Sequence, residues 1–164
     1  MSSIFRRACL PEAETVYHLI EQRIHWMDEN GISGWNKTDY LHFYPLRYFQ
    51  QQCAAGQLYV LASDAGQVQG AVILLEEDIR WADFAPAAAF YVHNLVSALD
   101  AHGTGAAILA GTEALAREKG KQFVRLDCAE TNAALNRFYE AAEYLPRGKC
   151  TDGPYHGILR EKAL

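Results

Sequence analysis

The chain has 164 residues, 50% hydrophobic and 21% charged, so we expect a single globular domain over residues 1–164 with a full core. Its 15 Lys and Arg and 20 Asp and Glu give a net charge of −5, and no basic run predicts a nucleic-acid partner. Its four cysteines stand singly without metal-ligand spacing, and no apolar run reaches the roughly 18 residues of a membrane helix. The first residues also lack the apolar core of a signal peptide. We therefore expect a cytoplasmic protein with neither a metal nor a membrane partner.

The first third of the sequence predicts one short strand followed by two helices. Residues 3–9 favour a strand, and residues 12–29 carry apolar side chains at helical spacing up to Asn30-Gly31. Thr38-Asp39 can cap a second helix that Gly56 ends. Pro45 within it favours either two pieces or a late start.

The middle of the sequence predicts three strands and a long helix. Residues 57–63 and 68–75 are typical of a hairpin around a turn at Asp64-Ala65-Gly66, and residues 81–86 form a connecting loop. Residues 87–97 are apolar and aromatic, which favours a strand. A turn with two glycines follows at residues 100–105, and residues 106–119 favour a helix that stops at Gly120.

The last third adds a strand at residues 123–127, a helix at 133–142, and two closing strands at 145–150 and 156–160 joined by a turn at 151–154. The complete order is β-α-α-β-β-β-α-β-α-β-β. This order predicts an α/β (α+β) fold with a mixed, mostly antiparallel sheet flanked by helices.

The glycine turn before the long helix has the composition of an anion site. The first N–H groups of a helix have no internal acceptor, and the helix dipole adds partial positive charge there. Gly103 and Gly105 remove side chains near the backbone, and Ala106 and Ala107 keep the first turn thin. The spacing is neither that of a Walker loop nor that of the dinucleotide fingerprint, which would need glycine where Ile108 stands.

Residues 102–107, HGTGAA, fit the pattern Q/R-x-x-G-x-G/A, and the chain here resembles the GCN5-related N-acetyltransferases (GNAT). In that family the pattern binds the pyrophosphate of coenzyme A. His102 departs from it, because the family has Gln or Arg there. The order of elements is similar over nearly the full length. Asn132 and Tyr139 also match a second family motif, although Glu143-Tyr144 replaces the usual Gly-Phe.

The resemblance implies direct transfer of an acetyl group from acetyl-CoA to a primary amine on a small molecule or peptide. It assigns the acid that protonates the departing thiolate to Tyr139, and main-chain contacts with pantetheine to Leu95 and Ser97. Further cofactor contacts are expected from the loop and from two asparagines of the second motif, namely His102, Gly103, Thr104, Gly105, Ala106, Ala107, Asn132 and Asn136. Asn132 also suits a plain helix cap, and Asn136 simple exposure.

The base that deprotonates the amine is less defined by the sequence. His93 or Asn94 should face the cleft, because neighbouring strand residues point oppositely, and His93 is our candidate base. Glu76 and the acidic residues after it are alternatives. For the acceptor we propose Trp26, Trp35 and Glu76, although core packing beside Met27 suits Trp26 better.

Two other interpretations stay open from the sequence. One is a non-catalytic sensor that binds acyl-CoA, and the other is an interaction domain in which residues 102–107 only join two elements. A homodimer through edge strands is also possible.

Overall fold

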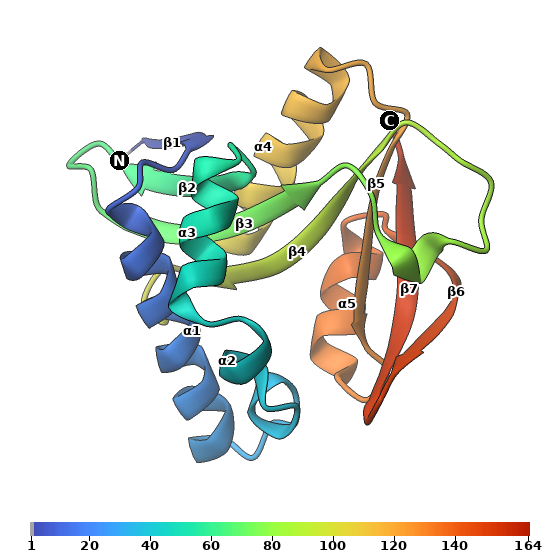
Figure 1. The fold of residues 1–164 in the computed structure, drawn as a ribbon, viewed down its shortest axis with the longest axis horizontal. Helices are drawn as coiled ribbons and strands as arrows, with labels where there is room; N and C mark the ends of the chain where they lie inside the picture. The colour runs from blue at the N-terminus through green and yellow to red at the C-terminus, as the bar shows by residue number, and fades with distance from the viewer. Residues whose placement is uncertain (1) are drawn as a thin grey trace. The chain divides into compact units, whose positions relative to one another are not determined.

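The computed structural model of the protein describes residues 2–164. Its strands form a seven-stranded, mostly antiparallel sheet in the order β1-β2-β3-β4-β5-β7-β6, flanked by helices (Figure 1). This architecture confirms the predicted fold class and order of elements. The elements are β1 (Ser3–Arg7), α1 (Glu12–Glu29), η1 (Trp35–Lys37), α2 (Tyr40–Phe43), α3 (Leu46–Ala54), β2 (Leu58–Ser63), β3 (Val68–Leu75), η2 (Ile79–Trp81), β4 (Ala89–Ser97), α4 (Thr104–Glu118), β5 (Phe123–Ala129), α5 (Ala133–Ala141), β6 (Leu145–Asp152) and β7 (Tyr155–Ala163), where η marks a 3-10 helix.

Five differences from the sequence prediction change an element or a connection, and the remaining element ends shift by at most two residues. The second predicted helix, expected after Thr38-Asp39, is divided into α2 and α3, because Pro45 has an extended backbone and serves as the N-cap of α3. The unpredicted η1 precedes it. The loop expected at residues 81–86 is preceded by the unpredicted η2. Helix α4 begins two residues early, so that Gly105 lies in the helix rather than in the turn. The last two strands extend until Asp152 pairs with Tyr155, because Gly153 takes a positive φ of 56° and permits a tight connection.

The chain divides into two compact units, and β4 and α4 each contribute to both. The first unit contains the chain up to Leu74 together with His93–Gly111, and the second contains Leu75–Val92 and Thr112–Leu164. The candidate residues fall into both units, and each unit is described by itself below.

In the first unit, β1, β2 and β3 pair antiparallel, and helices α1 and α3 lie together on one face of these strands (Figure 1). Val16 and Ile20 of α1, Phe49 of α3 and Val60 of β2 are fully buried. The part of helix α4 that belongs to this unit packs closely against β1. A Cβ atom on Gly111 would lie 2.5 Å from the ring of Phe5 in β1, so only glycine permits this approach.

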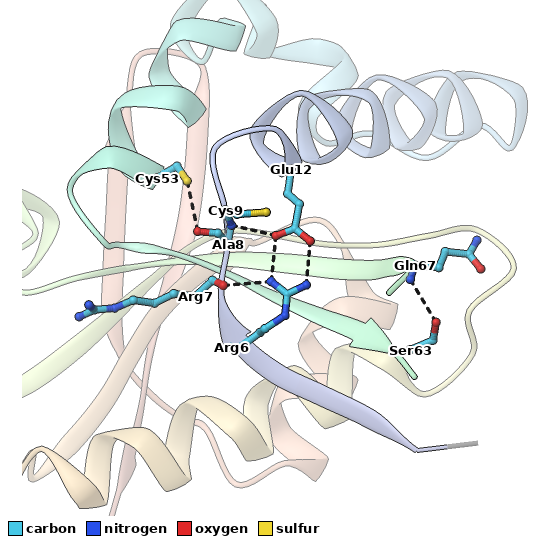
Figure 2. A network of polar contacts seen from close by, with 8 residues as sticks. All are labelled: Arg6, Arg7, Ala8, Cys9, Glu12, Cys53, Ser63 and Gln67. Carbon is cyan, nitrogen blue, oxygen red and sulfur yellow. Dashed lines mark hydrogen bonds and ion pairs between the residues drawn. The ribbon is translucent and has the colours of Figure 1, made fainter. Parts of the chain in front are cut away.

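A polar network joins the end of β1 to the start of α1 (Figure 2). The guanidinium of Arg6 donates two hydrogen bonds to the carboxylate of Glu12, at 2.9 and 2.8 Å. The N–H of Cys9 donates a third bond to Glu12 at 2.9 Å. These bonds place a carboxylate at the N-terminus of α1, where the helix dipole favours negative charge.

In the second unit, β4 and β5 pair in parallel through residues 89–91 and 123–125, while β7 pairs antiparallel with both β5 and β6. Trp81, Ala89, Tyr91 and Leu159 form a buried cluster. Arg125 is buried beside it, with its guanidinium 4.6 Å from the centre of the Trp81 ring and its Nε 2.7 Å from the Glu161 carboxylate. The charge is thus paired inside the unit, as burial requires.

Candidate functional site

The glycine turn of the first unit ends in an open helix start. Gly103 has a φ of +78°, and the space around its missing side chain is empty to 4 Å. The first helical hydrogen bond of α4 runs from the N–H of Ala107 to the carbonyl of Gly103, at 3.1 Å. By helix geometry the N–H groups of residues 104–106 precede this bond and have no acceptor within the helix.

The side chains of this turn leave those N–H groups accessible. His102, Gly103, Ala106 and Ala107 are exposed, and Gly105 is half-buried. Thr104 is the exception, because it is buried and its methyl group faces Gly70 of β3. A ligand of Thr104 would therefore meet its main chain rather than its hydroxyl. The turn can hold an anion through main-chain donors and the helix dipole.

The last residues of β4 belong to the same unit as the turn. His93, Leu95 and Ser97 are half-buried, and the carbonyl oxygen of Ser97 accepts a hydrogen bond of 2.9 Å from Nη2 of Arg23 in α1. Ser97 was predicted to contact pantetheine through its main chain. Its carbonyl oxygen therefore already accepts one hydrogen bond, from Arg23. Between His93 and Leu95, Asn94 is buried and has a φ of +53°. Burial still alternates along this part of the strand, as expected, with His93, Leu95 and Ser97 half-buried and Asn94 and Val96 buried.

The segment from η1 to α3 carries a continuous series of aromatic rings. Trp35 stacks on Tyr40 with 4.6 Å between ring centres, Tyr40 contacts Tyr44 at 4.6 Å, and Tyr44 contacts Tyr48 at 5.0 Å. One face of Trp35 is therefore covered by Tyr40. Trp26 of α1 is half-buried, with the guanidinium of Arg23 4.9 Å from its ring centre.

Tyr139 lies in the second unit on α5 and is 95% buried, with 5% exposed. Its ring packs edge-on against Phe138 and Tyr144, at 5.2 and 6.0 Å between centres. Burial, with smaller effects from Cys128 and Asp127, raises the pKa of Tyr139. The phenol therefore keeps its proton at neutral pH, which a proton donor requires.

The two asparagines of the second motif have structural partners. Oδ1 of Asn132 accepts a 3.0 Å hydrogen bond from the N–H of Leu135, so Asn132 is the N-cap of α5. Nδ2 of Asn136 donates to the carbonyls of Ala129 and Asn132, both at 2.9 Å. Its Oδ1 accepts from the buried Arg160 at 3.1 Å. Any cofactor contact of the Asn136 side chain would have to replace one of these bonds.

The acidic alternative for the base also has a partner, since Glu76 forms an ion pair with Lys121 in the second unit. Glu76 is exposed. An incoming ammonium group would compete with Lys121 for this carboxylate.

Over residues 2–164, no three His, Cys, Asp or Glu side chains gather in a way that could hold a metal ion. The four cysteines are free thiols. Within the same residues, every helix is too short or too polar to cross a bilayer.

Sequence reasoning missed Arg23 and Gly70, which shape the first unit, and it named Asn94 only as a residue that could face the cleft. The only available signal was composition. Asn is disfavoured inside strands, and a glycine within a strand suggests a close backbone approach. Neither signal says which partner is approached.

The fold of this chain is similar to those of several solved structures. No protein-family model matches the sequence, and neither does any curated protein. A GNAT-family acetyltransferase from Listeria monocytogenes superposes over 99% of this chain and 95% of its own, with a TM-score of 0.82 and 25% identity. The chain has the GNAT acetyltransferase fold.

Two further solved structures align over the whole chain. The PaiA N-acetyltransferase of Thermoplasma acidophilum, solved in complex with coenzyme A, aligns over 100% of both chains with a TM-score of 0.75 and 18% identity. Ard1 from Thermoplasma volcanium aligns over 100% of this chain and 99% of its own, with a TM-score of 0.74 and 15% identity. At 25% identity the Listeria monocytogenes structure supports acetyl transfer as the general class of activity, whereas the two Thermoplasma structures show the fold alone.

Proposed function

We propose that the protein is an N-acetyltransferase that moves an acetyl group from acetyl-CoA directly to a primary amine on a small molecule or peptide. The observation that carries this proposal is the open start of α4 after Gly103, with exposed residues at positions 102, 103, 106 and 107. The diphosphate of coenzyme A would lie at this helix start, because free N–H groups and the helix dipole favour an anion there. Main-chain N–H groups at Gly103, Thr104, Gly105 and Ala106 would hold it, with His102 and Ala107 beside them, because the N–H of Ala107 already donates to the carbonyl of Gly103.

The thioester would lie along β4 in this proposal. Main-chain groups of Leu95 and Ser97 would bind the pantetheine arm, and a nearby N–H would polarise the thioester carbonyl. The buried phenol of Tyr139 would give its proton to the sulfur as the carbon–sulfur bond breaks. The phenol is protonated at neutral pH, as the donor must be before the thiolate leaves.

The amine attacks only in its neutral form, so one group must take a proton from it. We propose His93 for this step, directly or through water, because a neutral imidazole nitrogen can accept a proton. Trp26, Trp35 and Glu76 are the proposed acceptor contacts. The half-buried Trp35 on its stacked series of rings suits a cationic or aromatic acceptor.

A panel of primary amines, with detection of free thiol released from acetyl-CoA, tests catalysis and acceptor choice together. We expect release that depends on one class of amine. A parallel thermal-shift titration with acetyl-CoA separates binding from turnover, since ligand at 100 times Kd adds roughly 2.7 kcal/mol to the free energy of unfolding. Binding without release over the whole panel would instead favour the non-catalytic acyl-CoA sensor. No shift at millimolar acetyl-CoA would contradict both.

A further inference from the structure

Asn94 in β4 has a backbone conformation that its neighbours in the strand do not share. Its φ of +53° lies in the left-handed region, where non-glycine residues are uncommon and Asn is among the best tolerated. The residue is 9% exposed and sits between the half-buried His93 and Leu95. A left-handed residue inside a strand kinks it and redirects the peptide groups that follow. The kink therefore sets the direction of the main chain from Leu95 to Ser97.

Two tyrosine hydroxyls hold the side chain of Asn94. Its Nδ2 donates to Oη of Tyr40 in α2 at 2.5 Å, and its Oδ1 accepts from Oη of Tyr48 in α3 at 3.3 Å. Both polar atoms of one buried amide are thus bonded to partners on two different helices. Burial, with a smaller effect from Tyr44, raises the pKa of Tyr48, so its hydroxyl stays protonated and able to donate.

The tyrosines are themselves held by ring packing. Tyr40 lies between Trp35 and Tyr44, and Tyr48 lies between Tyr44 and Phe49, with 5.3 Å between the Tyr48 and Phe49 ring centres. Phe49 is fully buried in the core of the first unit. The two hydroxyls that meet Asn94 are therefore fixed in position by the core rather than by the strand.

We propose that Asn94 is a positioning residue whose clamp by Tyr40 and Tyr48 maintains the kink in β4 and so orients the main-chain groups of Leu95 to Ser97 toward the acyl carrier. This inference rests on the proposed function. It extends that function by linking the α2–α3 segment mechanically to the strand that would hold the thioester. A buried Asn that only satisfied its own hydrogen bonds would not need the left-handed backbone.

The test uses the full-length protein and four variants. Tyr40→Phe combined with Tyr48→Phe removes both hydroxyls and keeps both rings. Asn94→Gly and Asn94→Ala both remove the amide, but only glycine adopts positive φ without strain. Tyr17→Phe is the matched control, because Tyr17 belongs to the same ring series through Phe49 and makes no hydrogen bond to Asn94.

We expect the Tyr40/Tyr48 double variant to lose about tenfold or more in kcat, because small misplacements at a reacting centre are costly. Its Kd for acetyl-CoA should change less than about threefold, because most binding comes from the start of α4. Asn94→Gly should keep several-fold more turnover than Asn94→Ala, and Tyr17→Phe should match the wild type. Equal kcat for the glycine and alanine variants at equal folded fraction would overturn the proposal.

A second readout needs no ligand. In labelled protein, the three-bond HN–Hα coupling and the 13C shifts of Asn94 report whether φ is positive. We expect these values to change in the double variant and not in Tyr17→Phe, and an unchanged positive φ would overturn the clamp. Absence of acetyl-CoA binding in the wild type would instead overturn the proposed function alone, because the coupling measurement decides the clamp separately.

Discussion

Gly70 of β3 and Thr104 of α4 approach so closely that no side chain fits between them. A Cβ atom on Gly70 would lie 2.6 Å from Cγ2 of Thr104 and 2.7 Å from the carbonyl oxygen of Val96. One of these contacts is to backbone, which cannot rotate away. The glycine therefore sets the distance between the start of α4 and the strands, and with it the position of the proposed anion site.

Replacing Gly70 with Ala should displace the start of α4. Overpacking of this kind costs about 1–3 kcal/mol in the free energy of unfolding. We expect that loss in urea denaturation, together with weaker acetyl-CoA binding in the thermal-shift titration. Gly148→Ala is the control, because its added Cβ would meet only the Phe84 ring at 3.6 Å. A Gly70→Ala protein as stable as the wild type would show that the strands can move apart without cost.

Ala106→Glu should separate cofactor binding from folding. Ala106 is exposed in the first turn of α4, where a carboxylate is favourable for the helix but repels a diphosphate. We expect an unchanged melting temperature and at least about a tenfold rise in the Kd for coenzyme A. Ala114→Glu is the matched control, since the exposed Ala114 lies ~12 Å further along the helix axis. Equal Kd values for the two variants would place the diphosphate elsewhere.

Tyr139→Phe should lower turnover by about 100-fold, a typical contribution of a general acid, while the Kd for acetyl-CoA changes little. The ring stays in its buried site, so the fold should be retained. Because burial raises the pKa of Tyr139 above its ordinary value of 10, the wild-type rate should show no loss from this group below about pH 10. Stopped-flow measurement of thiol release across pH checks both expectations. Wild-type turnover in the variant would remove the assignment.

Acid should weaken the junction of β1 and α1 through Glu12. The hydrogen bond from Arg6, with a smaller one from Cys9, lowers the pKa of Glu12 from 4.5 to about 2. A lowered pKa means that stability is present above the ordinary pKa and is lost as the pH falls from about 4.5 toward 2. The Arg6 side chain is 38% exposed, so solvent screening limits the loss to about 1–2 kcal/mol.

Urea unfolding at pH 7 and pH 3 measures this effect. Glu12→Gln keeps the shape of the side chain but cannot titrate, so its stability should fall less between the two pH values than that of the wild type. Identical falls would show that the Arg6–Glu12 pair in Figure 2 does not contribute to acid sensitivity.

Local pattern was enough to predict α1 and β3 with their observed bounds, because hydrophobic spacing and terminal Asn-Gly or turn residues act over a few positions. Local pattern was insufficient to predict where α4 begins. Gly105 suits both the loop before the helix and a first helical turn without bulky side chains. In the structure Gly105 belongs to the helix, and Gly103 is the residue of the turn with a left-handed backbone.

Local sequence pattern was also insufficient to predict the contacts of the candidate site. Asn132 was predicted to contact the cofactor and was also suited to cap α5, and the cap is observed through Leu135, while the cofactor contact stays a prediction. The partners of Asn136 could not be predicted, since Arg160 lies 24 positions later and reaches it only through the pairing of β5 with β7.

The sequence alone determined the order of elements and the presence of a glycine-opened helix start, because both depend on residues adjacent in the chain. Only the tertiary structure decided that β4 is kinked at Asn94, that Tyr40 and Tyr48 hold the kink, and that Gly70 admits the start of α4. These features depend on contacts between residues up to 54 positions apart. Chain order carries no information about such distances until strands and helices have packed.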